Sequence, residues 1–279
     1  MWTVLQIELF KIFKRPRTYI AFVAIAAIVI LIQLAFYVDG ESYVQFMLQT
    51  ISESFTVEGK ILNGYLICYV ILQTLLIHVP LLIALIAGDM VAGEANMGTL
   101  RLLISKPVSR ESLMLSKFLA SLVYTLLLLV WMAFLSLLIS LLVFGPGDLM
   151  IFKSQEIVVL KSSDIMWRYY CCFGFAAIAM TTVASLAFLL SIFAENSIGP
   201  IITTMSIIIV FTILTSMDLP LFTAIKPYIF TSHMLGWKGF LDDPINYRGI
   251  FRSGGILFLH IVLFVSTAIV IFKKKDILS

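Results

Sequence analysis

Six stretches without a single charged side chain are the feature that most constrains this sequence. Each is 19 to 27 residues long, and together they hold 132 of the 279 residues. About 20 apolar residues in a helix cross the ~30 Å hydrocarbon layer of a bilayer, and only a helix or a closed barrel satisfies its backbone hydrogen bonds there. Barrel strands would alternate apolar and polar residues, and these runs do not. The predicted membrane helices are residues 19–38, 66–87, 118–144, 170–193, 198–217 and 254–272.

The overall composition agrees with these spans. Charged residues make up 13% of the chain and the mean hydropathy is +1.06, whereas about a quarter of the residues in a soluble domain are charged. This composition excludes a water-soluble globular protein. We expect an all-α integral membrane protein whose single domain covers residues 1–279.

The distribution of Lys and Arg predicts how the spans are oriented. An even number of spans places both termini on one side of the membrane. If that side is the cytoplasm, the inner segments carry eleven Lys and Arg in about 59 residues, and the outer loops carry eight in about 81. The positive-inside rule therefore places both termini in the cytoplasm. No dense basic patch lies elsewhere, so we expect no nucleic-acid partner.

Three further segments have recognisable patterns. In residues 1–16, apolar and polar side chains alternate at helical spacing up to Pro16, which predicts an amphipathic helix in the inner membrane interface. Pro80 in the second span cannot donate a hydrogen bond to Leu76, so it is a candidate hinge, with simple packing as the alternative. The aromatic-rich loop 218–253 predicts either two short helices dipping into the outer leaflet or an ordinary membrane-surface loop.

The sequence lacks the usual motifs for catalysis or ion coupling. The spans contain no Asp, Glu, Lys or Arg, and the phosphate-binding pattern G-x-x-x-x-G-K-[ST] fails at Gly59-Lys60. There is no H-E-x-x-H, no G-x-S-x-G and no Cys/His cluster with metal-ligand spacing. We expect no catalytic, cofactor-binding or metal site in this chain. A protein of this kind would take its energy from a partner bound on the cytoplasmic side, where ATP is found.

The loop 88–110, between the second and third spans, is the most informative inner segment. Residues 99–104 are strongly apolar for a free loop, which indicates a covered surface. Pro107 ends this piece, and Ser109 followed by Glu111 predicts the N-cap and an acidic first turn of the third helix. Residues 110–144 contain no Pro or Gly, which predicts a helix of ~52 Å whose first turns project beyond the membrane.

This segment resembles the ABC-2 permeases, the integral membrane subunits of type-2 ABC transporters with the type V exporter fold. The similar pattern comprises Glu94, Gly98-Thr99, Leu102-Leu103, Lys106-Pro107-Val108-Ser109-Arg110 and Lys117. The N-terminal amphipathic helix, six spans, tight inner hairpin at 194–197 and apolar outer loop are also similar to that family, so the resemblance covers nearly the whole chain.

The resemblance implies a permease subunit of an ATP-binding cassette exporter. It implies pairing with a second permease chain, identical or related, in the plasma membrane of a bacterial or archaeal cell. Separate ATPase subunits, which bind ATP and Mg²⁺, would dock on a short coupling helix in loop 88–110. The coupling residues implied are Glu94, Gly98, Thr99 and Arg101, with Pro107 and Arg110 shaping the junction with the third helix.

Two other functions stay open at this stage. One is a membrane scaffold or assembly subunit that transports nothing, for which the same loop would bind a partner. The other is a secondary carrier or an intramembrane enzyme.

Overall fold

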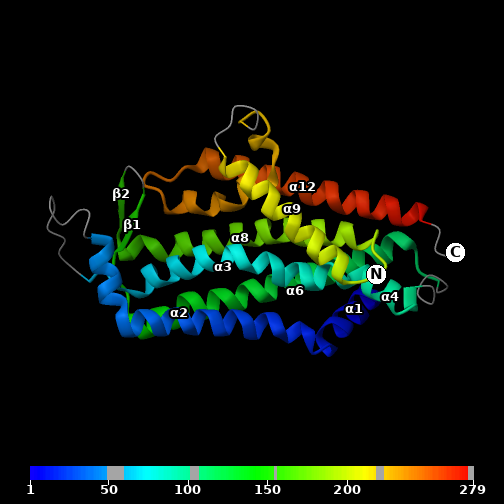
Figure 1. Ribbon diagram of the computed structural model, residues 1–279, viewed down its shortest axis with the longest axis horizontal. Helices are drawn as coiled ribbons and strands as arrows, with labels where there is room; N and C mark the ends of the chain where they lie inside the picture. Colours follow the sequence, from blue (N-terminus) through cyan, green and yellow to red (C-terminus); the bar gives the residue numbers. More distant parts are fainter. Residues whose placement is uncertain (49–59, 101–106, 154–155, 218–222, 276–279) are drawn as a thin grey trace.

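A computed structural model describes residues 1–48, 60–100, 107–153, 156–217 and 223–275. The long helices lie side by side in an elongated bundle, with both chain ends at one end of the bundle and a small β-sheet at the other (Figure 1). The elements, in chain order, are α1 Trp2–Lys14, α2 Arg17–Leu48, α3 Gly64–Ala87, α4 Asp89–Asn96, α6 Arg110–Ala133, η1 Phe134–Ile139, α7 Ser140–Phe144, β1 Leu149–Phe152, β2 Ile157–Leu160, α8 Ser162–Ser191, α9 Ile198–Ser216, η2 Lys226–Tyr228, α11 Phe230–His233, η3 Met234–Leu241 and α12 Tyr247–Lys274.

Within the residues that the structure describes, six helices are long and apolar enough to cross a membrane, which agrees with the predicted number of spans. They cover Arg17–Phe46, Gly64–Asn96, Arg110–Phe144, Ser162–Ser191, Ile198–Ser216 and Tyr247–Lys274. Several continue well past the charge-free runs, because polar residues at a helix end can face water without interrupting the helix. The fourth, for example, begins eight residues before Tyr170.

Helix α8 lies at the centre of the bundle. It packs against α3, α6, α9, α12 and η3. Two thirds (67%) of its most apolar window is buried inside the chain, compared with 17% for α9 and 22% for α12. The outer helices therefore leave large apolar faces uncovered by the rest of the chain, as helices in contact with lipid do.

The end of α2 and the beginning of α3 differ from the predicted span boundaries. The first predicted span ends at residue 38, but α2 bends at Asp39 (φ −132°, ψ 20°) and continues to Leu48. The Asn63-Gly64 pair begins α3, two residues before the predicted span. The Asn63 side chain accepts hydrogen bonds from the backbone N–H groups of Tyr65 (3.0 Å) and Leu66 (3.1 Å), so it caps the helix.

Residues 110–144 form the predicted long helix, with one irregularity. Ser109 caps its first turn by accepting a hydrogen bond from the Ser112 N–H at 3.2 Å, as expected. Near the other end, residues 134–139 adopt π-helical geometry, which leaves carbonyl groups without their usual partners. The buried side chain of Gln33 in α2 donates to one of these, the Leu135 carbonyl, and to the Ser140 hydroxyl, both at 3.0 Å.

The end of the bundle away from the termini contains features that we did not predict. Strands β1 and β2 form an antiparallel hairpin, a small exception to an otherwise helical chain. The described part of the loop 218–253 folds onto α8 and α12 through η3, whose Trp237 is fully buried. The buried side chain of Arg168 connects α8 to the end of η3. It pairs with Asp164 of α8 and donates to the carbonyls of Phe240 (3.1 Å) and Asp242 (2.8 Å).

Candidate functional site

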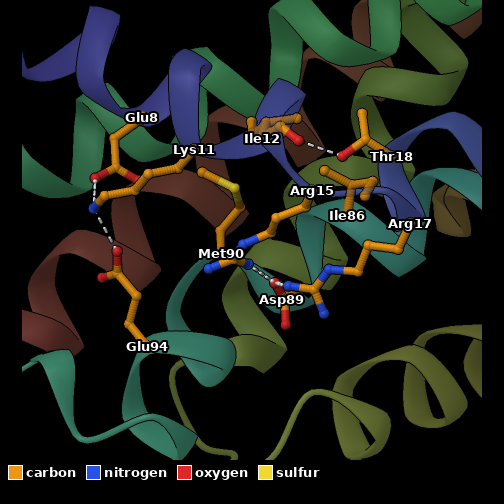
Figure 2. Close-up of a pocket in the computed structure, with 10 residues that line it drawn as sticks. All are labelled: Glu8, Lys11, Ile12, Arg15, Arg17, Thr18, Ile86, Asp89, Met90 and Glu94. Atoms are coloured by element: carbon orange, nitrogen blue, oxygen red, sulfur yellow. Dashed lines mark hydrogen bonds and ion pairs between the residues drawn. The ribbon is translucent and has the colours of Figure 1, made fainter.

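Charged side chains from four segments meet at the end of the bundle that holds both termini. They come from α1, from the first residues of α2, from the short helix α4 and from the start of α6. Figure 2 shows the part contributed by α1, α2 and α4, where acidic side chains of α4 point toward basic side chains of the N-terminal segment. A cavity of only about 20 Å³ lies between them, so the charges are closely packed rather than arranged around a ligand pocket.

Four of these side chains form a closed ring of ion pairs, which we call the four-charge ring. Glu8 and Lys11 lie on α1, Glu94 on α4 and Lys117 on α6. The Lys117 Nζ atom is 2.8 Å from Glu8 Oε2 and 2.7 Å from Glu94 Oε2. The Lys11 Nζ atom is 2.7 Å from Glu8 Oε1 and 2.8 Å from Glu94 Oε1. Each carboxylate therefore contacts both ammonium groups, and the charges cancel.

Three of the four side chains in the ring are buried. The side chain of Lys117 is 0% exposed, those of Glu8 and Glu94 are 3% and 6% exposed, and that of Lys11 is 32% exposed. A buried charge is tolerated only when it is paired and hydrogen-bonded, so loss of any one member leaves an uncompensated charge in the protein interior. The ring therefore holds α1, α4 and α6 in one arrangement.

The pKa values on α1 follow from this pairing. Burial alone would raise the pKa of Glu8, but attraction to Lys117 and hydrogen bonds from Lys11 and Lys117 outweigh it, and the pKa is lowered. Burial would lower the pKa of Lys11, but its hydrogen bonds and attraction to Glu8 and Glu94 raise it. Both groups are thus held in their charged forms.

A second charged group surrounds Asp89, at the start of α4. Its carboxylate is 5% exposed and accepts hydrogen bonds from Arg15 at 2.6 Å and from Arg17. The hydroxyl of Ser197, which precedes α9, donates to its other oxygen. Asp89 also lies in the first turn of α4, where the helix dipole favours a negative charge. It joins α4 to the corner between α1 and α2 and to the α8–α9 hairpin.

The far end of α4 is exposed, in contrast to its acidic side chains. Asn96, Met97 and Gly98 face the surroundings, and the Met97 side chain is 53% exposed. Gly98 has φ +66°, in the left-handed region that favours glycine, and ends the helix. Met97 and Gly98, which we call the α4 tip, therefore project from a helix whose other side is anchored by ion pairs.

Three of the predicted coupling residues lie on α4 or directly after it. Glu94 lies in the four-charge ring, Gly98 is in the α4 tip, and the Thr99 hydroxyl donates to the Glu94 carbonyl at 3.3 Å. Arg101 lies outside the described residues. Pro107 is exposed just before the cap of α6.

Arg110, also predicted to shape this junction, contacts α12. It donates to the carbonyls of Phe272, Lys273 and Lys275 at 3.4, 3.1 and 2.8 Å, so it binds the end of α12 rather than α4. A basic side chain on these last carbonyls also opposes the negative end of the helix dipole. Arg110 thus connects the start of the third span to the end of the sixth.

Sequence reasoning missed most of the partners in this site. The pattern of residues 1–16 places Glu8 on the polar side of the predicted interfacial helix, but in the structure Glu8 is 2% exposed and is paired with Lys11 and Lys117. One signal was available, because Glu8, Glu94 and Lys117 are isolated charges close to apolar runs, where an unpaired charge is costly.

Two other kinds of site were considered, a hinge at Pro80 and a metal site. Pro80 is buried inside α3, which is one continuous helix through this residue, so its role as a hinge stays a prediction. Among the residues that the structure describes, no group of three or more His, Cys, Asp or Glu side chains is arranged to hold a metal ion.

Two comparisons place the chain among known sequences. "Uncharacterized protein YhcI" from Bacillus subtilis (strain 168) is 27% identical over 201 residues, which cover 69% of this chain and 63% of that relative. The match thus spans less than two thirds of the relative's length. A family described as "Protein of unknown function (DUF2705)" matches residues 19–278, from the first span to the last residue but one. The chain therefore belongs to the DUF2705 family.

Proposed function

We propose that this chain is the membrane subunit of an ATP-binding cassette exporter. Two permease chains, identical or related, enclose the substrate pathway, and separate ATPase subunits dock on the loop 88–110. The protein lies in the plasma membrane with both termini in the cytoplasm. ATP and Mg²⁺ bind to the partner, because this sequence has no phosphate-binding loop.

The single observation that supports this proposal most strongly is the anchoring of α4. Asp89 and Glu94, at two positions of an eight-residue helix, are held by cations from α1, from α6, from the first residue of α2 and from Arg15 between α1 and α2. The α4 tip is exposed. A push on the tip therefore displaces α4 together with the helices that are ion-paired to it, since separating them would leave buried charges unpaired. A short helix with this arrangement is suited to transmit a conformational change from a docked protein.

The charge distribution supports the orientation. The end of the bundle that holds the α4 tip also carries Lys14, Arg15 and Arg17, and the last turn of α12 adds Lys273 and Lys274. These cations lie within a few residues of the spanning segments, where the positive-inside rule applies. The α4 tip would then face the cytoplasm, the compartment in which an ATPase can reach it.

The experiment uses an exposed residue, so that the fold is preserved. The chain is expressed together with its neighbouring genes, in wild-type form and as Met97→Arg, and the ATPase that co-purifies with each form is measured. The matched control is Ile157→Arg on β2, another exposed apolar residue (41% exposed) at the opposite end of the bundle. We expect Met97→Arg to lose at least about tenfold in ATPase affinity, because a charge at a packed interface loses roughly 1.4 kcal/mol or more.

A measurement of the ATP hydrolysis rate distinguishes the exporter from the scaffold alternative. In the exporter, wild type and Ile157→Arg change the rate of ATP hydrolysis by the bound ATPase, and Met97→Arg does not. A partner that binds all three proteins equally, with an unchanged hydrolysis rate, would contradict the proposal.

A further inference from the structure

A groove lies on the side of the bundle where α1 and α2 meet α6. Its volume of about 640 Å³ is within the usual range for small-molecule sites. The lining side chains are Phe13 of α1, Tyr19 and Phe22 of α2, Leu127, Val130 and Trp131 of α6, and Phe134 of η1. Tyr19 is 51% and Val130 is 65% exposed. The groove is therefore open to the surroundings of the bundle, and the proposed docking of an ATPase does not use it.

The lining of this groove is apolar. Only two of its seven side chains carry a polar atom, and both donors are used within the chain. The Tyr19 hydroxyl donates to the Phe13 carbonyl at 3.0 Å, and the Trp131 Nε1–H donates to the Phe22 carbonyl at 3.1 Å. Tyr and Trp at a membrane surface commonly keep their polar tips toward water, whereas both of these turn toward the backbone. The lining therefore presents aliphatic and aromatic surface.

The aromatic walls of the groove are held in place by packing. The Trp131 and Phe134 rings are stacked, with 6.0 Å between centroids, and the Phe22 ring is 6.5 Å from that of Trp131. On its other side Phe22 packs edge-on against Tyr124, which is fully buried and donates to the Thr18 carbonyl. The groove is thus preformed, so a ligand that fits it does not have to order its walls.

The position of the groove along the bundle specifies what surrounds it. Its lining residues on α2 lie in the first turns of one membrane-spanning helix, and those on α6 and η1 lie within another. From Leu127 to Phe134 the helix rises about 10 Å, two thirds of the ~15 Å that one leaflet contributes to the hydrocarbon layer. The groove is also next to exposed apolar residues of the same helices, Val23 and Leu126, so it is continuous with the surface that contacts lipid.

From this geometry we infer that the groove holds one acyl chain of a phospholipid, from the leaflet at the end of the bundle that contains the termini. An apolar cavity does not retain water, and an empty groove would lose the dispersion contacts of its walls. A flexible hydrocarbon chain restores these contacts by lying along α6 from Leu127 to Phe134. It fills the space between α6 and the α1–α2 corner, and so supports the placement of α1, which carries Glu8 and Lys11 into the four-charge ring. The inference holds whether or not an ATPase drives the chain.

The test uses the full-length chain and phosphatidylglycerol whose acyl chains carry bromine, which quenches tryptophan fluorescence on contact. The chain is reconstituted in bilayers of this lipid, or of the same lipid without bromine, and is then extracted into lipid-free detergent. Loosely held lipid is removed by extraction, so the quenching that persists reports a retained acyl chain. The variant Trp131→Phe identifies the contribution of Trp131.

The variant Val130→Phe fills part of the groove without adding a tryptophan. Its matched control is Leu142→Phe on α7, because Leu142 is an exposed apolar residue of the same membrane-spanning helix (77% exposed) that does not line the groove. Size-exclusion profiles confirm that each variant is folded.

We expect the wild type and Leu142→Phe to keep the same quenching after extraction. Val130→Phe should lose most of it, and Trp131→Phe should lose the part that comes from the groove. Complete recovery of wild-type fluorescence on extraction would mean ordinary surface lipid only and would overturn the inference, as would equal persistent quenching in Val130→Phe and Leu142→Phe. A disulfide between two copies of Val130→Cys in the bilayer would also overturn it, because a second copy of the chain would then occupy the groove.

Discussion

The substitution Lys117→Met is the sharpest test of the four-charge ring. Methionine keeps a similar length and an apolar stem but removes the ammonium that contacts Glu8 at 2.8 Å and Glu94 at 2.7 Å. Two buried carboxylates would then share only Lys11, so one negative charge in the interior is left without a partner. Removal of one member of a buried ion pair costs about 3–5 kcal/mol. For a chain of this size the unfolding midpoint should fall by roughly 6–20 °C.

The assay is thermal unfolding in detergent, followed by tryptophan fluorescence. The control is Lys14→Met, because Lys14 is an exposed lysine on α1 whose removal leaves no buried charge unpaired, and its midpoint should stay within about 2 °C of wild type. The double variant Glu8→Gln with Lys117→Met restores the charge balance of the ring. It should be less destabilised than the sum of the two single variants, by about 1–3 kcal/mol. A Lys117→Met midpoint no lower than that of Lys14→Met would refute this reasoning.

Three other predictions concern the same structure. The pKa of Glu8 in the folded protein is lowered from its ordinary value of 4.5. The contribution of ionised Glu8 to the free energy of unfolding is therefore complete above about pH 4.5 and is lost as the pH falls through the folded-state pKa. Between about pH 5 and pH 3 the thermal unfolding midpoint of the wild type should fall more than that of Glu8→Gln. Gly98→Ala forces a side chain into φ +66° with no compensating contact, so hydrogen exchange at the end of α4 should become faster, as expected for a local cost of about 1–2 kcal/mol; unchanged exchange would argue against this turn. Arg168→Leu leaves the carbonyls of Phe240 and Asp242 without their donor, so it should lower the midpoint by several degrees, whereas the exposed Lys161→Leu should not.

The number and placement of the membrane helices could be predicted from the sequence because they depend on local composition. A run of about 20 residues without charge has few alternatives to a helix in lipid. Helix caps were equally local: Ser109 caps α6 as its spacing to Glu111 suggested. The same local rule failed at Asp39, where a polar residue marks a bend in α2 rather than its end.

The candidate site could be predicted only in part, because it depends on contacts between distant segments. Glu8 and Lys117 are 109 positions apart, and no pattern along the chain specifies that they meet. The helical pattern of residues 1–16 placed Glu8 on the polar side of an interfacial helix, and the two lysines within 3 Å offset the cost of burying its charge. The β-hairpin and the packing of η3, with its buried Trp237, onto α8 and α12 are tertiary features of the same kind.

The central claim is that a partner ATPase acts on this chain through the α4 tip, and a crosslink at Met97 tests it most directly. A photoreactive amino acid is placed at position 97 in cells that express the neighbouring genes, with position 157 on β2 as the control, and the crosslinked products are identified by mass spectrometry. The account predicts a crosslink from position 97, and not from 157, to a polypeptide that carries the G-x-x-x-x-G-K-[ST] loop. A crosslink to that ATPase from position 157 alone would contradict it.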